Sequence, residues 1–321
     1  MNYRKTFFAF AATGVLAVGV AACGDDSDDG GGGGGDLSGA IAIDGSSTVA
    51  PLSEPIGELF NEENPDVQVS VGTSGTGGGF EKFCAGETDI SDASRPIDEK
   101  EEVPVCEENG IDHEEVVVAN DALTVVVNPE NPVTCVTVDQ LNEVYDPSST
   151  ITSWGDIEGL DAEFDEELDI FSPGADSGTF DYFTDAINGE EGAQRSEGVN
   201  IVGEDDNATV TGVSGSPGGI GYFGYSFYVE NQDQLKALEI ENEDGECVAP
   251  SEETTQDGSY NPLGRQLFIY PSAQALEKPE VSEFVDFYLE NANDVAGQAG
   301  FIPMTEEQVA ESQEKVDSLS G

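Results

Sequence analysis

Two short stretches decide the fold: residues 44–48, Asp-Gly-Ser-Ser-Thr, and residues 172–180, Ser-Pro-Gly-Ala-Asp-Ser-Gly-Thr-Phe. Each follows a short apolar run typical of a buried strand and precedes a segment with helical spacing. A third stretch, residues 72–79, follows the alternating valines of residues 67–71 and also leads into a helix. A helix start with hydroxyls and free backbone N–H groups can hold a tetrahedral oxyanion. One such loop is usually a plain N-cap, but three in one chain indicate an anion site.

Apolar strand-like runs alternate with helical stretches over the roughly 280 residues after the N-terminal region, which predicts an α/β fold. We expect residues 241–262, which are acidic, to form a surface excursion. Two or three helices should end the chain. The other expected helices are residues 51–63, 79–85, 137–145 and 179–187, and the expected strands are residues 115–118, 122–127, 219–225 and 264–270.

The N-terminus has the pattern of an export leader over residues 1–22. Arg4 and Lys5 precede an apolar run that is too short to span a membrane. Residues 20–23, Val-Ala-Ala-Cys, resemble a bacterial lipobox, so we expect cleavage before Cys23 and lipidation of its sulfur. The Gly/Asp run that follows contains nothing that could pack, and residues 23–38 should form a flexible tether. The mature chain is therefore expected to be an extracytoplasmic domain anchored to the cell membrane.

Four cysteines remain once Cys23 carries a lipid, an even number in an exported chain. Three pairings are possible in principle, and we favour Cys84–Cys106 and Cys135–Cys247. A metal site is the alternative, but the chain has no CxxC motif and a single histidine. We therefore expect no metal and no cofactor.

The chain is extremely acidic, with 67 acidic and 10 basic residues and a formal net charge of −57. Removal of Arg4 and Lys5 with the leader makes the mature charge −59. Such a chain repels itself in dilute salt, and high salt relieves the repulsion, so we expect a salty, halophilic setting. Nucleic-acid binding is excluded because no basic patch exists to neutralise phosphates.

Five segments, in this order, resemble the PstS-type substrate-binding protein of the phosphate ABC transporter. They are residues 45–51, 74–80, 89–96, 176–180 and 218–222, and the resemblance extends from about residue 40 to residue 302. It implies a two-lobed periplasmic-binding-protein fold of type II, the Venus-flytrap fold, with a central ligand cleft. The implied lobe I is residues 39–119 plus 263–321, and the implied lobe II is residues 120–262.

The resemblance also implies a phosphate site with three corners. Thr48 with the Val49 backbone supplies the first, Thr76 with Ser74 the second, and residues 177–179 the third. The full implied set is Ser47, Thr48, Val49, Ser74, Thr76, Asp92, Ser94, Arg95, Asp176, Ser177, Gly178 and Thr179.

The chain departs from one branch of this family in its charged residues. That branch has an arginine a few residues before Ser-Gly-Thr, where this chain has Pro173 and Gly174, and an aspartate near Ser94, where this chain has Arg95. We infer that Arg95 supplies the cation. Either Asp92 or Asp176 would accept the proton of the bound phosphate, whereas sulfate has no proton to donate.

The expected function is delivery of inorganic phosphate to the permease of an ABC importer by a membrane-tethered monomer. One alternative is another tetrahedral oxyanion, such as sulfate or arsenate. Another is an interaction or adhesion protein that keeps the fold. Catalysis is not expected, because His113 lies in an acidic stretch without a serine elbow and no cluster of metal ligands is present.

Overall fold

The computed structural model describes residues 37–203 and 205–320. The expected leader, Cys23 and the Gly/Asp run up to Asp36 lie outside these residues. Within the described ranges, no helix combines the length and apolar character needed to cross a membrane. The four cysteines and three arginines that follow Cys23 all fall inside them.

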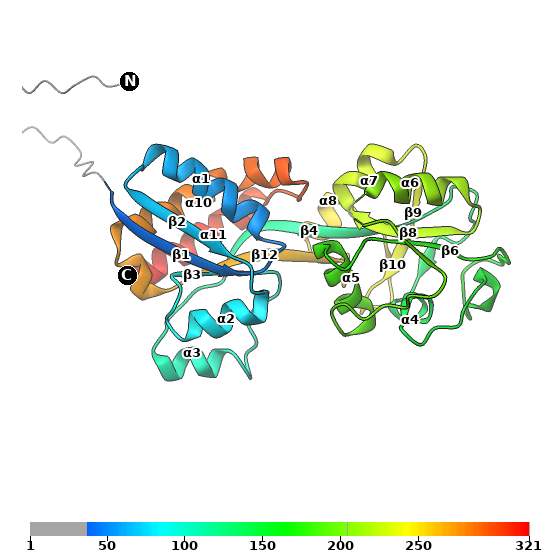
Figure 1. Cartoon of the computed structure of the whole chain (residues 1–321), viewed down its shortest axis with the longest axis horizontal. Helices are drawn as coiled ribbons and strands as arrows, with labels where there is room; N and C mark the ends of the chain where they lie inside the picture. Colours follow the sequence, from blue (N-terminus) through cyan, green and yellow to red (C-terminus); the bar gives the residue numbers. More distant parts are fainter. Residues whose placement is uncertain (1–36, 204, 321) are drawn as a thin grey trace, which may run out of the picture. The chain divides into compact units, whose positions relative to one another are not determined.

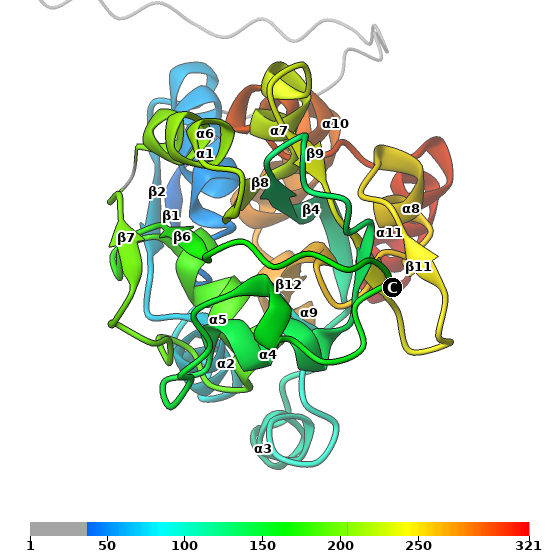
Figure 2. The ribbon, with the colours of Figure 1, turned by 90° about the vertical axis from the view of Figure 1, so that its right-hand side faces the viewer.

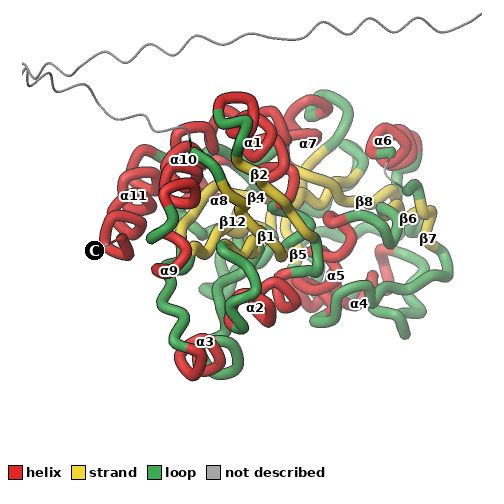
Figure 3. Tube along the Cα trace, turned by 60° about the vertical axis from the view of Figure 1, so that its left-hand side comes forward, coloured by secondary structure: helices red, strands yellow, loops and turns green. Residues whose placement is uncertain are grey.

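The N-terminal part of the chain alternates strands and helices. Its elements are β1 (Gly39–Gly45), α1 (Ala50–Glu63), β2 (Val67–Gly72), α2 (Thr76–Cys84), β3 (Ile90–Ala93) and α3 (Val103–Asn109). The three strands are parallel, so the loops at their carboxyl ends gather at one edge of the sheet. Helix α1 packs on one face of these strands together with α10 (Pro279–Ala299), and α2 and α3 lie on the other face (Figures 1 and 3).

Strand β4 (Val116–Val127) is a single, fully buried strand of 12 residues, where the sequence indicated two strands. The expected break fell at two polar residues, Asn120 and Asp121. Both are buried but paired, because the Asn120 amide bonds Gln308 and Asp121 accepts a hydrogen bond from Arg265. A buried polar side chain that finds a partner does not interrupt a strand.

The C-terminal end of β4 enters a second group of elements, within which α6 and α7 lie on one side of the strands and α4 and α5 on the other (Figure 2). The helices here are α4 (Val138–Tyr145), the 3-10 turn η1 (Trp154–Asp156), α5 (Gly178–Asn188), α6 (Asp206–Gly215), α7 (Tyr225–Asn231) and α8 (Glu252–Gln256). The strands are β5 (Cys135–Val136), β6 (Asp169–Ser172), β7 (Val199–Ile201), β8 (Gly219–Gly224), β9 (Lys236–Ala237), β10 (Glu239–Glu241) and β11 (Cys247–Val248).

The chain returns along β12 (Gly264–Pro271), which is antiparallel to both β3 and β4. It ends in α9 (Ala273–Leu276), α10 and α11 (Glu306–Ser320). The main sheet has the order β2-β1-β3-β12-β4-β8-β6-β7, with β9 also paired to β4, and β11-β10-β5 form a small second sheet. Strands β4 and β12 therefore link the two groups of elements side by side (Figure 1).

The buried apolar residues form separate clusters in the two groups. The largest contains residues between 41 and 119 and between 267 and 316. The second contains residues between 122 and 263 with Ile302, and a small third one surrounds Phe223. This distribution supports the expected lobes, whose boundaries stay a prediction.

Both expected disulfides are confirmed. Cys84–Cys106 joins the end of α2 to the middle of α3, with Cα atoms 4.2 Å apart. Cys135–Cys247 ties β5 to β11 across the small sheet, with Cα atoms 5.9 Å apart and a sequence separation of 112. Both distances lie close to or within the range of ordinary disulfides.

Candidate functional site

The loops at the carboxyl ends of β1, β2 and β3 form one wall of a cavity of about 910 Å³. The opposite wall consists of α5 and the segment after it, and residues 255–258 and the start of β12 complete it. The lining residues are Ser46, Ser47, Thr48, Ser74, Gly75, Thr76, Gly77, Gly78, Ser94, Arg95, Pro96, Gly178, Asp181, Tyr182, Asp185, Ala186, Glu191, Thr255, Gln256, Asp257, Gly258, Pro262, Gly264, Arg265, Gln266 and Phe268.

The first loop is fixed from below by β3. The Ser46 amide donates to the Asp92 carbonyl at 2.9 Å, and the Thr48 amide donates to the Ser46 hydroxyl at 3.2 Å. Gly45 has a φ of 147°, and a Cβ there would lie 2.0 Å from the Asp92 carbonyl oxygen. Only glycine allows this close approach. This close approach holds the first loop against β3, with the Thr48 side chain at the cavity wall.

The second loop starts α2 three residues earlier than its glycines suggested. Gly75 precedes the helix with a φ of 81°, and Thr76 to Gly78 already belong to its first turn. Glycine normally disfavours a helix interior, which is why the sequence placed the start at Gly79. A Cβ on Gly79 would lie 2.5 Å from the Gly45 Cα, so tight packing requires glycine here and brings the two loops together.

Hydroxyls of the second and third loops bond to each other. Thr76 Oγ1 lies 3.1 Å from Ser94 Oγ and accepts from the Ser94 amide at 3.2 Å. Ser74 is engaged differently, because its hydroxyl donates to Asp44 at 2.5 Å. Burial acts to raise the pKa of Asp44, but hydrogen bonds from Lys82 and Ser74 outweigh it and lower the pKa.

Arg265 contacts residues of both walls. Its Nη2 donates to Thr48 Oγ1 at 3.2 Å, and its Nε and Nη2 each donate to Asp121 Oδ2 at 3.3 Å. The guanidinium carbon lies 3.4 Å from the centre of the Tyr182 ring on α5. Burial raises the pKa of Asp121, and the charge of Arg265 partly opposes that rise. Arg265 is not among the residues assigned from the sequence, which placed the cation at Arg95.

Arg95 lines the cavity at its rim and is nearly half exposed, with 46% of its side chain accessible. Both terminal nitrogens donate to Glu102, at 2.8 Å each. These hydrogen bonds raise the pKa of Arg95, and burial opposes them. Arg195, by contrast, is buried and donates to main-chain oxygens of Val144, Ile151 and Glu197, which is a structural role.

The start of α5 forms the opposite wall. A Cβ on Gly178 would lie 3.6 Å from Thr48 Oγ1, so the first turn of α5 faces the first loop. Three acidic residues lie on this wall: Asp181, Asp185 and Glu191. Burial raises the pKa of Asp181, and burial followed by repulsion from Asp181 and Asp185 raises the pKa of Glu191.

The structure brings together seven of the twelve residues assigned from the sequence. Those in the cavity wall are Ser47, Thr48, Ser74, Thr76, Ser94, Arg95 and Gly178. Val49, Asp92 and Ser177 are buried beside it, Asp176 is exposed outside it, and Thr179 follows Gly178 in α5 without lining it. The Val49 amide is used within its own loop, where it donates to the Ser46 carbonyl at 3.2 Å.

Asp92 lies beneath the first loop and is fully buried. Ser53 donates to its Oδ1 at 3.0 Å, whereas its Oδ2 has no partner among the described residues. Burial raises the pKa of Asp92 to about 8; the Ser53 hydrogen bond opposes this, and Asp44 and Glu54 add to it. Neither Asp92 nor Asp176 reaches the cavity, although each was a candidate proton acceptor.

Residues 241–262 are more than the surface excursion expected from their acidity. Tyr260 is fully buried and donates to the Leu123 carbonyl at 2.9 Å. Thr255, Gln256 and Asp257 line the cavity. The one signal for this in the sequence is the aromatic and apolar content at the end of the segment, just before β12.

Comparison with known proteins identifies the family. Residues 30–292 match the family described as PBP superfamily domain. Protein SphX of Synechococcus elongatus is 46% identical over 266 residues, which cover 82% of this chain and 77% of that protein. The phosphate-binding protein PstS of Staphylococcus saprophyticus is 38% identical over 287 residues, 88% of this chain and 86% of that one.

A solved structure agrees with these sequence relatives. The crystal structure of a possible phosphate binding protein from Planctomyces limnophilus aligns with a TM-score of 0.83 and 41% identity. The alignment covers 89% of this chain and all of that one. This chain belongs to the PBP superfamily and, within it, to the PstS-type phosphate-binding proteins.

Proposed function

We propose that the protein binds one inorganic phosphate in this cavity and delivers it to the permease of an ABC importer. The observation that carries the proposal is the position of Arg265, whose guanidinium contacts Thr48 on one wall and the Tyr182 ring on the other. The names of the Staphylococcus and Planctomyces relatives support phosphate as the ligand. An arginine with adjacent hydroxyls suits a phosphate group, because charge-assisted hydrogen bonds are short and strong.

We assign the main cation to Arg265, in place of Arg95. Arg265 is held by one oxygen of Asp121 at 3.3 Å, a longer and weaker pairing than the two 2.8 Å bonds of Arg95 to Glu102. Its side chain is also less accessible than that of Arg95, with 17% against 46% exposed. Water screens a charge less where it is less accessible, so Arg265 should contribute more to the binding of an anion.

Helix starts supply the remaining attraction. The first turns of α2 and α5 lie at the cavity, through Thr76 to Gly78 and through Gly178. Free amides and the helix dipole at these ends favour an anion. Such short-range forces must dominate, because the chain as a whole, with a net charge of −57, repels anions.

Discrimination against sulfate requires a carboxyl group that lines the cavity. Asp181, Asp185 and Glu191 all line it, and we assign the role to Asp181 because it lies in the first turn of α5, as Gly178 does. A carboxylate can accept a hydrogen bond from the P–OH group of phosphate, but it only repels sulfate, which carries no such proton. Asp181 therefore takes the role that the sequence argument gave to Asp92 or Asp176.

A binding role fits the geometry better than catalysis. The single histidine, His113, does not line the cavity; its ring packs edge-on against Phe83 and at a tilt against Tyr270. A serine or cysteine hydrolase would need a base within hydrogen-bond reach of its nucleophile. The other reading, a tethered interaction protein that keeps the fold, predicts no phosphate binding at all.

Isothermal titration with phosphate, arsenate and sulfate in molar salt tests the proposal. We expect one phosphate per chain, a strong preference over sulfate, and loss of that preference in Asp181→Asn. Absence of phosphate binding, or equal affinity for sulfate, would contradict the proposal. Hydrolysis of phosphate esters would favour the enzyme alternative.

We also propose that a lipid on Cys23 tethers the protein as a monomer at the outer face of the cell membrane. The lipobox-like residues 20–23 and the Gly/Asp run after them support this. Cys23→Ser should release the protein from the membrane fraction and leave its phosphate affinity unchanged. Retention in the membrane fraction would contradict the anchor, and a folded, released form that fails to bind phosphate would contradict its independence from the site.

A further inference from the structure

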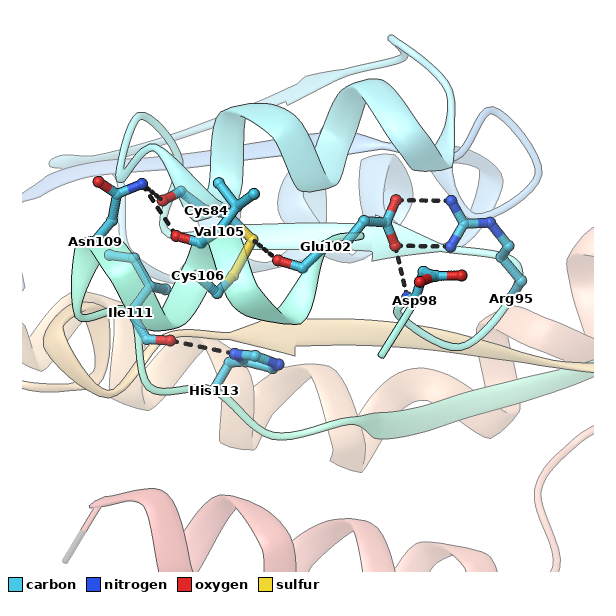
Figure 4. The surroundings of a disulfide bond; sticks show 9 residues. All are labelled: Cys84, Arg95, Asp98, Glu102, Val105, Cys106, Asn109, Ile111 and His113. Atoms are coloured by element: carbon cyan, nitrogen blue, oxygen red, sulfur yellow. Dashed lines mark hydrogen bonds and ion pairs between the residues drawn. A yellow bond between two sulfur atoms is a disulfide. The ribbon is translucent and has the colours of Figure 1, made fainter. Parts of the chain in front are cut away.

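The Arg95–Glu102 pair lies beside the disulfide-bonded helix α3 (Figure 4), and Arg95 also lines the cavity. Arg95 follows β3, and Glu102 is the residue just before α3. The two terminal nitrogens of the guanidinium each donate to one carboxylate oxygen of Glu102 at 2.8 Å, and Nη1 also donates to the Pro96 carbonyl at 3.0 Å. This planar edge of Arg95 is the one that a phosphate would otherwise use.

Glu102 is held in place by its surroundings independently of Arg95. Its Oε2 accepts a hydrogen bond from the Asp98 amide at 2.7 Å, and its own amide donates to the Asp98 carbonyl at 3.0 Å. The following helix is fixed by the Cys84–Cys106 disulfide and by Asn109, whose amide donates to the Cys84 carbonyl at 2.9 Å. Only 17% of the Glu102 side chain is exposed.

Arg95 nevertheless lies within reach of the anion site. It lines the cavity beside Ser94, and its Nη2 lies 3.8 Å from the position of a Cβ on Gly77, in the first turn of α2. Its guanidinium carbon is 5.6 Å from the centre of the Phe80 ring of the same helix. A charge so placed would attract an anion in the cavity, but the Glu102 carboxylate neutralises it from the other side.

We propose that Glu102 sets the phosphate affinity of the site by competing with the bound anion for Arg95. Glu102 thus acts through Arg95 and does not itself touch the ligand. The inference rests on the proposed phosphate function and adds to it a built-in counter-ion that weakens binding. In such a site Arg95 is paired with Glu102 and is only partly available to the anion. Removal of the Glu102 charge should therefore make the site bind phosphate more tightly.

The test compares Glu102→Gln with Glu101→Gln in phosphate titrations that all use the same salt concentration, in the molar range. Glutamine keeps an oxygen for the Asp98 amide but removes the charge, and Glu101 is an exposed neighbour of the same charge. We expect Glu102→Gln to bind phosphate about two- to fivefold more tightly, as the loss of a partly exposed ion pair allows. Glu101→Gln should bind like the parent.

A second arm distinguishes this mechanism from a change in folding. In an Arg95→Ala background, Glu102→Gln should produce no gain in affinity, because the cation that it releases is absent. Unchanged or weaker binding by Glu102→Gln, or a gain that persists without Arg95, would overturn the proposal. A parent protein that binds no phosphate would instead refute the proposed function on which the inference rests.

Discussion

The two arginines that line the cavity differ in their partners more than in their chemistry. Arg265 lies at the start of β12, against the Tyr182 ring. Two of its nitrogens donate to a single oxygen of Asp121, over longer distances than the bonds of Arg95 to Glu102. Arg95 lies at the rim, and its planar edge is matched to both oxygens of Glu102. The same side chain can therefore serve as a binding group or as a neutralised one. How closely the nearest carboxylate pairs with the guanidinium determines which of these roles it has.

Replacement of Arg265 should have the largest effect on phosphate binding. We expect Arg265→Ala to weaken phosphate binding by about ten- to more than a hundredfold, because a charge-assisted hydrogen bond contributes about 1.5–3 kcal/mol. Titration calorimetry measures the loss. Arg265→Lys, which keeps the charge but not the planar donors, should recover only part of it. Binding by Arg265→Ala that equals the parent would return the main role to Arg95.

The two buried carboxyl groups also differ in their partners, because Asp121 accepts hydrogen bonds from Arg265 whereas Asp92 accepts one from Ser53. Burial raises the pKa of Asp92 to about 8 from an ordinary value of 3.8. The folded state therefore holds this proton more tightly than the unfolded state. The stability that the protonated carboxyl contributes is complete below pH 3.8 and is lost as pH rises to about 8.

The measurement is the difference in unfolding free energy between the parent and Asp92→Asn as a function of pH. Within that window the parent should lose up to about 1.4 kcal/mol per pH unit relative to the variant. Chemical denaturation in constant high salt removes the contribution of long-range repulsion. A difference that does not change with pH would show that Asp92 is ionised throughout, despite its burial.

The hydroxyl of Thr48 links Arg265 to the first loop, at 3.2 Å from Nη2. Thr48→Val removes this hydroxyl at nearly constant volume and should cost about 1 kcal/mol of phosphate binding, or roughly fivefold in affinity. Thr48→Ser is the control that keeps the oxygen and should bind like the parent. Equal affinity of the valine and serine variants would show that Thr48 has no part in the site.

The smallest effect is expected for Arg95→Ala. If Arg95 were the main cation, as inferred from the sequence, the loss would be severe. The pairing with Glu102 leads us to expect less than about a fivefold loss, within the range of an exposed ion pair. The comparison with Arg265→Ala in the same titration is decisive, since a larger loss for Arg95→Ala would reverse our assignment.

Local patterns were sufficient to predict much of this structure. Residues 51–63 carried a complete helix signal, with a proline near the start and another after the end, and the four cysteines paired as expected. The continuity of β4 could not be foreseen, since it depends on Gln308 and Arg265 as partners from distant parts of the chain. Arg265 was missed for a similar reason: the contacts that make it a site residue are 144 and 217 residues away in sequence.

The paired strands β4 and β12 also have a mechanical consequence. A loop that joins two bodies lets them swing in many directions, but hydrogen-bonded strands form a ribbon that can bend and twist while it resists stretching and sliding. The ladder from Val116–Ile269 to Ala122–Gly264 ends where Arg265 and Asp121 pair at the cavity. Any flexing of this ribbon near that end would therefore displace the guanidinium and the two walls in concert. Arg265 lies on this ribbon itself, so a ligand that binds Arg265 also acts directly on the strands that link the two groups of elements.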